Sequence, residues 1–429
     1  MEIGRLYEAF LTCRGISTDT RSIVPGSLFF ALKGPRFNAN EFAREALEKG
    51  ARYAVVDEAH GATDPRCLMV DDTLTVLQAL ARHHRSTLTI PVIGLTGSNG
   101  KTTSKELVHA VLSQRFKTLA TQGNLNNHIG VPLTILQIDR SIEVAIVEMG
   151  ANHVGEIALL SSIAQPTHGF ITNIGRAHIG TFGGFENIVR GKSELYHHLI
   201  QSNGVVFVNS QNEMLANMAK RFKSPIFYPG ENDFYHCQLI SANPFVTVQA
   251  ANGERVQSQL VGAYNFENIA VALCIGKYFH VPDHEAHEAL RAYVPSNMRS
   301  QIIRKGSNTV ILDAYNANPS SMEAALNNLA AMDAKKKLAI VGDMYELEEE
   351  TEAEHRKVGE QLRQLDLPAL LCGPHMKAAA GAWPQALHFE TVTLLKGYLL
   401  EHPLTDTTVL VKASRGMRLE QVLDVISLQ

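Results

Sequence analysis

The sequence predicts an α/β protein of three domains, in which a central parallel sheet stands between two smaller α/β units. Runs that are apolar along nearly their whole length, such as PVIGLT (91–96) and IEVAIVEMG (142–150), alternate with helical segments. Strands of this composition are usually covered on both faces, as in a parallel sheet. At 429 residues the chain is also long enough for two to four domains.

The predicted domains comprise residues 1–85, 86–298 and 299–429. The first combines short strand-like pieces (SLFFAL, YAVVD, CLMVD) with one helical stretch, EFAREALEKGA. The central domain continues from PVIGLT through the strand-like runs HGFITNIG and NGVVFVNS. The third alternates strand-like runs with helical segments such as SSMEAALNNLAAM, which predicts a Rossmann-like fold. Its expected strands are TVILDAYNANP, KLAIVGDM, PALLCGP and TVLVKASRG.

Composition narrows the class of protein. Apolar residues make up 45% of the chain and charged residues 19%, as in an ordinary globular protein. The net charge of −4, without a basic cluster, argues against a large nucleic-acid footprint. Five scattered cysteines without a CxxC pair argue for a reducing compartment and against a zinc site. No signal-peptide pattern and no run of roughly 18 apolar residues is visible. We therefore expect a cytoplasmic monomer that does not insert into a membrane.

Residues 94–106, GLTGSNGKTTSKE, have the form of a phosphate-binding loop between a buried strand and a helix. Leu107, Val108, Val111 and Leu112 share one face of that helix, as packing on a sheet requires. This context favours a phosphate loop over a glycine turn that only caps a core helix. Backbone N–H groups and the positive end of the helix would hold phosphate oxygens.

Two side chains of the loop carry the predicted chemistry. Lys101 is expected to reach the β- and γ-phosphates of a bound nucleotide, and the Thr102 hydroxyl to bind Mg²⁺. The loop is shorter than the usual GxxxxGK[ST], because its nearest preceding glycine is Gly97. This spacing argues against motor, signalling and kinase NTPases, while it still predicts a P-loop ATPase-like central domain.

Three residues beyond the loop are candidate catalytic groups. Glu148 ends a predicted parallel strand, where it could hold Mg²⁺, although a plain surface carboxylate is an equal alternative. His178 lies in another strand-end loop, where a lone histidine is more often structural than a ligand. Lys192 repeats with Leu195 and Leu199 at helical spacing and so points inward. Such a lysine either reaches solvent or an ion pair, or is carbamylated by CO₂ to become a metal-binding carboxylate.

Several motifs, in this order, resemble the Mur ligases, the ATP-dependent amide-forming enzymes of bacterial peptidoglycan synthesis. They are GSNGKTT, NLNNHIGVPLTIL, EMGANHVGEI, NIGRAHIGTFGG and GKSEL. ILDAYNANPSSMEAAL (311–326), VGDMYELEEE (341–350) and VLVKASRGM (409–417) resemble the family member that adds a dipeptide to a nucleotide-linked tripeptide. The N-terminal TDTRSIVPGSLFFALKGPRF resembles a UDP-sugar-binding domain. The resemblance spans essentially the whole chain.

The resemblance implies roles for the matching residues. Those implied to bind ATP are Gly97, Ser98, Asn99, Gly100, Lys101, Thr102, Thr103, Asn265, Asn268, Arg299 and Asp313. Those implied to hold two Mg²⁺ ions are Thr102, Glu148, His178 and Lys192, the last as a carbamate. Those implied to contact substrates are Thr20 and Arg21 at the nucleotide sugar, Asn126 and Asn127 at the muramyl part, and Tyr315, Asn316 and Asn318 at the dipeptide. Lys101, Glu148, His178 and Lys192 form the implied catalytic set.

The implied reaction joins D-alanyl-D-alanine to UDP-N-acetylmuramoyl-tripeptide through an acyl phosphate, with release of ADP and phosphate. In this scheme the first domain binds the UDP substrate, the central domain ATP, and the third domain the dipeptide. The chain departs from the family pattern at FNANEF (37–42), where an Asp-Gly-His-type turn is common, and at Ala413, where glycine is common.

The same motifs argue against several other functions. The ligase that adds the third amino acid and the folylpolyglutamate-type ligases share the phosphate loop, but YNANP and NLNNHIGVPLT argue against both. A regulatory or scaffold protein that uses ATP only as a switch would not need the combination of Lys101, Glu148, His178 and Lys192. The same intact set argues against an inactive paralogue.

Overall fold

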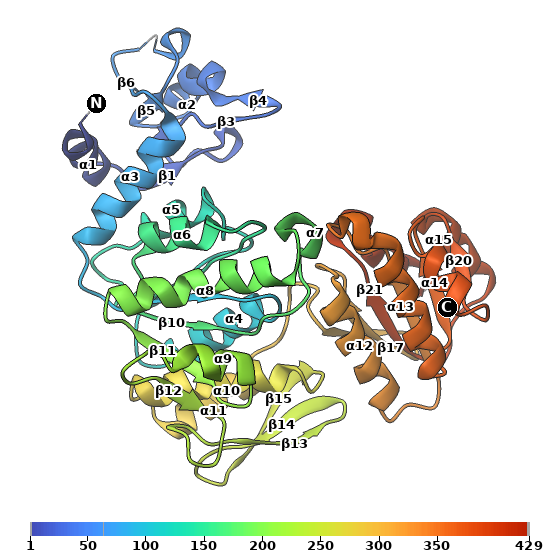
Figure 1. Ribbon diagram of the computed structural model, residues 1–429. Helices are drawn as coiled ribbons and strands as arrows, with labels where there is room; N and C mark the ends of the chain where they lie inside the picture. The colour runs from blue at the N-terminus through green and yellow to red at the C-terminus, as the bar shows by residue number, and fades with distance from the viewer. Residues whose placement is uncertain (1, 63, 427–429) are drawn as a thin grey trace.

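The computed structural model describes residues 2–62 and 64–426, which form three α/β domains, each built around its own sheet (Figure 1). We call them the first, central and third domains. The first lies at the top of Figure 1 and the third on the right, each against the central domain. The predicted α/β class with parallel sheets is confirmed. No helix among the described residues is long and apolar enough to cross a membrane.

The first domain contains a four-stranded parallel sheet in the order β1-β2-β5-β6. Its elements are α1 (Ile3–Leu11), β1 (Ile16–Ser17), η1 (Thr20–Ser22), β2 (Leu28–Phe30), β3 (Lys33–Gly34), β4 (Phe37–Asn38), η2 (Ala39–Phe42), α2 (Ala43–Glu48), β5 (Tyr53–Val56), η3 (Ala59–Gly61), β6 (Cys67–Met69) and α3 (Thr73–Ser86). The three strand-like runs expected here correspond to β2, β5 and β6.

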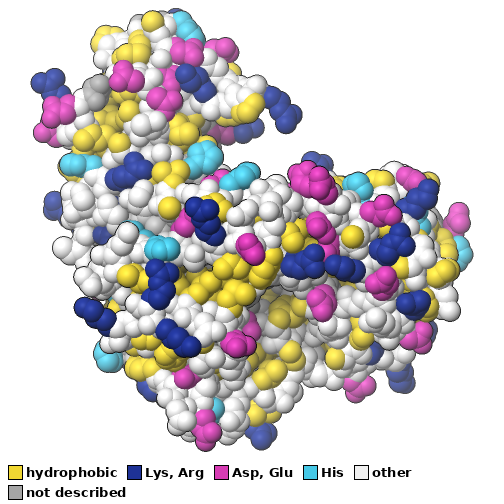
Figure 2. Space-filling model, viewed as in Figure 1, with side chains coloured by type: hydrophobic (Ala, Val, Ile, Leu, Met, Phe, Trp, Pro, Cys, Tyr) yellow, Lys and Arg dark blue, Asp and Glu magenta, His cyan; other side chains and the backbone are white. Residues whose placement is uncertain are grey.

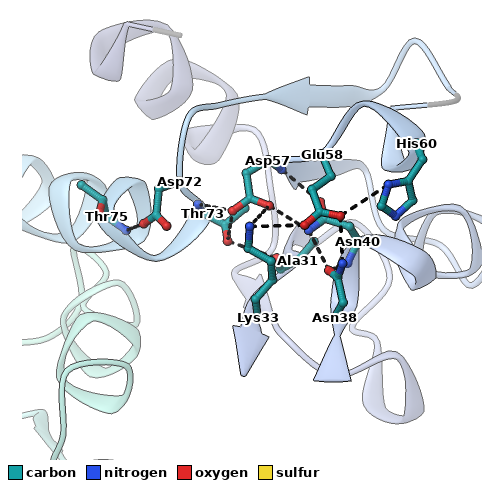
Figure 3. A network of polar contacts seen from close by, with 10 residues as sticks. All are labelled: Ala31, Lys33, Asn38, Asn40, Asp57, Glu58, His60, Asp72, Thr73 and Thr75. Atoms are coloured by element: carbon teal, nitrogen blue, oxygen red, sulfur yellow. Dashed lines mark hydrogen bonds and ion pairs between the residues drawn. The ribbon is translucent and has the colours of Figure 1, made fainter. Parts of the chain in front are cut away.

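A buried polar network braces this domain around the unusual FNANEF turn (Figure 3). The carboxylate of Asp57 follows β5 and is fully buried. It accepts hydrogen bonds from Asn40 Nδ2 at 2.8 Å and from the N–H of Thr73 at 3.0 Å, and it pairs with Lys33 Nζ at 3.1 Å. Asn38 Oδ1 in turn accepts from the backbone N–H and the side-chain amide of Asn40. The two asparagines of the turn therefore join the β3–β4 hairpin to β5 and to the start of α3.

The central domain contains a six-stranded parallel sheet in the order β12-β11-β10-β7-β9-β8. Its elements are β7 (Val92–Thr96), α4 (Lys101–Leu112), β8 (Thr118–Ala120), α5 (Gly130–Ile135), β9 (Val144–Glu148), α6 (Glu156–Ala164), β10 (His168–Ile171), α7 (Ile179–Phe182), α8 (Phe185–Gln201), β11 (Val205–Asn209), α9 (Glu213–Ala219), β12 (Ile226–Tyr228), β13 (Gln238–Ala242), β14 (Phe245–Gln249), β15 (Arg255–Val261), α10 (Asn265–Tyr278) and α11 (Asp283–Ala292). Helix α3 packs on α5 and α6 and so attaches the first domain.

Strand β7 lies between β9 and β10 in this sheet, and every residue of β7 and β9 is buried. The chain leaves β7 into the phosphate loop, so the ends of β9 and β10 flank that loop on either side. Ligands of open parallel sheets bind at the carboxyl ends of strands where the chain changes direction. The sheet order therefore brings Glu148 and the loop after β10 to the phosphate loop.

Strands β13, β14 and β15 form a separate antiparallel sheet that sequence analysis missed. Residues alternate between buried and more exposed along β14 and most of β15, which is the pattern of a sheet covered on one face. This alternation is the signal that would have revealed the strands.

The third domain contains a six-stranded sheet in the order β16-β17-β21-β18-β19-β20, in which only β16 is antiparallel to its neighbour. Its elements are β16 (Gln301–Lys305), β17 (Asn308–Asp313), α12 (Pro319–Ala331), β18 (Lys337–Gly342), η4 (Glu348–Glu350), α13 (Thr351–Gln364), β19 (Ala369–Cys372), α14 (Lys377–Ala382), β20 (Leu387–Phe389), α15 (Val392–Glu401), β21 (Thr408–Lys412), η5 (Arg415–Met417), η6 (Leu419–Val422) and α16 (Leu423–Ile426). The four expected strands correspond to β17, β18, β19 and β21.

Candidate active site

A cavity of about 960 Å³ lies at the carboxyl ends of β7, β9 and β10 and extends to the third domain. On the visible face, the surface is hollowed between the first and third domains (Figure 2). The predicted site residues that line the cavity are Ser98, Asn99, Gly100, Lys101, Thr102, Thr103, Asn126, Asn127, Glu148, His178, Asn265, Asn268, Arg299, Asp313, Tyr315, Asn316 and Asn318. The predicted residues outside its lining are Gly97, Lys192, Thr20 and Arg21.

Two glycines give the phosphate loop its shape. Gly97 has φ +146°, and a Cβ there would lie 2.0 Å from Thr172 Oγ1. Gly100 has φ +78°, and its Cβ would lie 2.5 Å from Asn268 Oδ1. Both backbone conformations disfavour side chains, and both positions are too crowded for one. The glycines therefore let the loop lie directly against its neighbours.

The loop that follows β10 holds the phosphate loop in place. The N–H of Ser98 donates to the carbonyl of Asn173 at 3.0 Å, and the N–H of Asn99 donates to Asn173 Oδ1 at 3.0 Å. Thr172 Oγ1 donates to the carbonyl of Asn99 at 2.6 Å. The phosphate loop is therefore pre-organised by its own domain.

Lys101 begins α4 and folds back over the loop. Its Nζ donates to the carbonyls of Gly97 at 2.7 Å and Ser98 at 3.3 Å. Burial lowers the pKa of Lys101 to about 8, against the opposing attraction of Glu148. An anion in the cavity would favour the charged form of this lysine.

Glu148 ends β9 and is 1% exposed. Its Oε1 accepts from Asn126 Nδ2 at 2.9 Å and from Thr102 Oγ1 at 3.3 Å. Among the described residues, its Oε2 has no hydrogen-bond partner, and the nearest cation is Lys105 Nζ at 3.9 Å. A buried carboxylate oxygen without a partner, beside a threonine hydroxyl, fits the oxygen-donor chemistry of Mg²⁺.

The other two predicted metal ligands are not joined to Glu148 by any hydrogen bond or ion pair among the described residues. His178 has φ +56° at the start of α7, and its Nδ1 contacts a carboxylate oxygen of Glu346 from the third domain. Lys192 is 1% exposed in α8, as its spacing predicted, and its Nζ donates to the carbonyl of Ala151 at 3.3 Å. Within the described chain, no three His, Cys, Asp or Glu side chains converge on a possible metal position.

Lys192 has the electrostatic character that carbamylation requires. Burial, together with repulsion from Lys101, lowers the pKa of Lys192 to about 7. A large share of these amines is therefore neutral near neutral pH, and only the neutral amine attacks CO₂.

The residues implied to bind ATP outside the phosphate loop lie on both sides of the connection to the third domain. Asn268 Nδ2 donates to Asn265 Oδ1 at 2.8 Å, and Asn268 Oδ1 accepts from Ser104 Oγ at 2.8 Å. The guanidinium of Arg299 stacks over the Tyr315 ring at 3.9 Å from its centroid. Both residues line the cavity, so this pair places a planar cation there.

The third domain adds a buried cation that sequence analysis missed. Lys412, at the end of β21, is 1% exposed and lines the cavity. Its Nζ pairs with Asp313 Oδ2 at 2.6 Å and donates to the carbonyl of Asn316 at 3.2 Å. The sequence contains a signal for Lys412, because Lys412 is a charged residue at the end of a buried strand, as Glu148 is. Sequence analysis also missed Lys105, which is buried one helical turn after Lys101 in α4.

Two of the asparagines predicted to bind substrates form hydrogen bonds within the protein. Asn127 Oδ1 accepts from the N–H groups of Ile129 and Gly130, where α5 begins. Asn318 caps α12, and its Nδ2 donates to Asn99 Oδ1 in the phosphate loop at 2.8 Å. The third domain thus contacts the phosphate loop directly.

Thr20 and Arg21 lie in η1 of the first domain, away from the cavity lining. The guanidinium of Arg21 forms an ion pair with the carboxylate of Asp19, with Nη2 at 2.5 Å from Oδ2. The side chain of Arg21 is 87% exposed. Hydrogen bonds from Arg21 lower the pKa of Asp19 to about 2. The role of Thr20 and Arg21 in binding the substrate stays a prediction.

Comparisons with known proteins agree with the geometry. The Mur ligase middle domain matches residues 95–276, and the Mur ligase, glutamate ligase domain matches residues 298–415. The chain is 33% identical to the UDP-N-acetylmuramoyl-tripeptide–D-alanyl-D-alanine ligase of Bacillus subtilis, over 95% of this chain and 92% of that relative.

Solved structures extend the likeness to the whole fold. A crystal structure of MurF from Acinetobacter baumannii superposes with a TM-score of 0.88 at 31% identity, covering 100% of this chain and 98% of that one. MurF from Thermotoga maritima in complex with ADP superposes with a TM-score of 0.85 at 27% identity, covering 97% and 98%.

Proposed function

The chain belongs to the Mur ligase family, and we propose that its cavity joins D-alanyl-D-alanine to UDP-N-acetylmuramoyl-tripeptide in an ATP-dependent reaction of peptidoglycan synthesis. The single observation that carries this proposal is the continuity of the cavity from the phosphate loop to Tyr315, Asn316 and Asn318 of the third domain. The relative from Bacillus subtilis is named for this reaction, and the chain covers nearly all of its length.

The chemistry requires an activated carboxylate, because joining a carboxylate to an amine in water is unfavourable. ATP supplies the activation when its γ-phosphoryl group passes to the substrate carboxylate and forms an acyl phosphate. The two reactants are both anions, so positioning and charge neutralisation dominate the barrier. Lys101 and the N–H groups of the phosphate loop provide fixed positive charge at this position.

We propose that Thr102 and Glu148 hold Mg²⁺, which would neutralise phosphate charge when bound. The orphaned Glu148 Oε2 supports this assignment. His178 and a carbamylated Lys192 are proposed to complete a two-ion site. His178 would have to release its contact with Glu346 in order to bind the metal. The lowered pKa of Lys192 supports the carbamate.

The dipeptide amine then attacks the acyl carbon, and phosphate leaves. Tyr315, Asn316 and Asn318 are proposed to position the dipeptide, and the third domain would shield the acyl phosphate from water. Because one chain lines the whole cavity, we propose that the protein acts as a monomer. We place it in the cytoplasm, where ATP and nucleotide-linked precursors are available.

The test is to incubate the protein with ATP, Mg²⁺, UDP-N-acetylmuramoyl-tripeptide and D-alanyl-D-alanine, and to follow phosphate release and product mass. Phosphate release coupled to the mass of the UDP-linked pentapeptide is the expected result. Turnover only with the dipeptide precursor and a single amino acid would assign the chain to the preceding ligation step. ATP binding without turnover would instead favour a nucleotide-controlled switch.

A further inference from the structure

The loop that follows β10 contacts the third domain through Arg176. The N–H of Arg176 donates to Ser320 Oγ at 3.0 Å, in the first turn of α12. Its Nη2 lies 2.5 Å from Glu354 Oε1 in α13. Arg176 therefore joins the central domain to two helices of the third domain at once.

Glu354 is an unusual partner for a surface arginine, because its side chain is 3% exposed. Its other cation is Lys357 at 2.8 Å, one turn along the same helix and 53% exposed. Among the described residues, Arg176 is therefore the only ion-pair partner that Glu354 has across the domain boundary. A buried carboxylate depends strongly on its partners, so this pair has more influence on domain placement than an exposed pair has.

The loop that carries Arg176 also holds the phosphate loop. Ser98 Oγ lies 2.9 Å from both the carbonyl oxygen and the N–H of Gly175, and Asn173 anchors Asn99. Asn99 in turn accepts from Asn318, two residues before Ser320. The contacts thus close a ring from the phosphate loop, through the β10 loop and α12, back to the phosphate loop.

We propose that Arg176 and Glu354 are a positioning pair, which sets the third domain against the phosphate loop and thereby the apparent affinity for the incoming dipeptide. Neither residue lines the large cavity, so the pair acts through the segment that carries Tyr315, Asn316 and Asn318 rather than by touching the substrate. The inference about the dipeptide rests on the proposed function.

The test is a double-mutant cycle of Arg176→Ala, Glu354→Gln and both together, with KM for D-alanyl-D-alanine and kcat measured for each. Each single change is expected to raise this KM about tenfold with a smaller change in kcat, and the double change to add nothing further. Arg176→Lys keeps the charge and is expected to recover part of the loss. Lys357→Ala is the matched control, because it removes the partner of Glu354 that does not cross the boundary; its KM should stay at the wild-type value.

Small-angle scattering with a non-hydrolysable ATP analogue and Mg²⁺ gives an independent measurement of domain placement. Arg176→Ala is expected to increase the radius of gyration relative to the wild type. Unchanged KM in Arg176→Ala, or effects that add in the double variant, would overturn the proposal. If the wild type ligates no dipeptide, the proposed function fails, and the scattering comparison alone then decides whether the pair sets the third domain.

Discussion

The central and first domains hold their predicted ligand-binding residues in opposite ways. Glu148 and Lys192 are each 1% exposed and are fixed by a sheet and a helix of the domain core. The side chain of Arg21 is 87% exposed on a three-residue turn, where Asp19 is its only ion-pair partner within the part of the chain that the structure describes. Groups that stabilise charge in a transition state act most strongly when they are fixed in a site of low polarity. Recognition of a soluble nucleotide sugar can instead begin on a hydrated surface. The difference predicts that substitutions in the two regions affect different kinetic constants.

Among the substitutions considered, Glu148→Gln is expected to have the largest effect on kcat. The amide keeps the size of the side chain but removes the charge that we assign to Mg²⁺ binding, so kcat should fall by about 10²–10³-fold. The Mg²⁺ concentration needed for half-maximal activity should also rise. Steady-state kinetics at several Mg²⁺ concentrations measure both values. Wild-type kcat and Mg²⁺ dependence would show that Glu148 only packs at the end of β9.

Gly97→Ala tests whether the loop is pre-organised by close contact. The added Cβ would lie 2.0 Å from Thr172 Oγ1, so either the loop or the Thr172 side chain that holds Asn99 must shift. The Kd for ADP should then rise by about tenfold or more. Gly397→Ala is the matched control, because a Cβ there meets nothing within 4 Å and the residue lies inside α15. That change should leave the Kd unaltered and stabilise the fold by about 0.5–1 kcal/mol. Calorimetric titration and thermal unfolding check the two results.

The pKa of Lys192 predicts a dependence on pH and CO₂. With a pKa of about 7, roughly a tenth of these amines are neutral at pH 6 and roughly nine-tenths at pH 8. Carbamate formation consumes the neutral amine and releases a proton, so it should increase as pH rises from 6 to 8. Enzyme depleted of CO₂ should regain activity on addition of bicarbonate, more completely at pH 8. A carbamate signal from ¹³C-bicarbonate by NMR should appear in the wild type and be absent in Lys192→Arg.

Arg21→Ala is expected to have the smallest effect on stability. Arg21 is exposed and, among the described residues, forms an ion pair only with Asp19, so its removal should leave the melting temperature nearly unchanged. If Arg21 binds the nucleotide sugar, KM for the UDP substrate should rise several-fold, while kcat and the Kd for ADP stay unchanged. An unaltered KM would remove Arg21 from the substrate site.

The sequence predicted best what depends on local pattern. The run from β7 through the phosphate loop to α4 combines an apolar strand, glycines and a helical face, and all four predicted apolar residues of α4 are buried. It predicted least what depends on distant partners. Arg176 and Glu354 are 178 positions apart in the chain, and nothing local marks either as one of a pair. The His178–Glu346 contact could not be predicted for the same reason, because it depends on how the third domain meets the central one.

The central claim is that the phosphate loop serves to activate a carboxylate, and transfer of an oxygen isotope tests it most directly. The reacting carboxylate of UDP-N-acetylmuramoyl-tripeptide would be labelled with ¹⁸O and the reaction run with ATP and D-alanyl-D-alanine. If the carboxylate attacks the γ-phosphorus and the amine then attacks the acyl carbon, the released phosphate retains the bridging oxygen. We predict one ¹⁸O in each phosphate released with product, measured by mass spectrometry. Phosphate free of ¹⁸O, formed alongside the pentapeptide product, would contradict the acyl-phosphate mechanism.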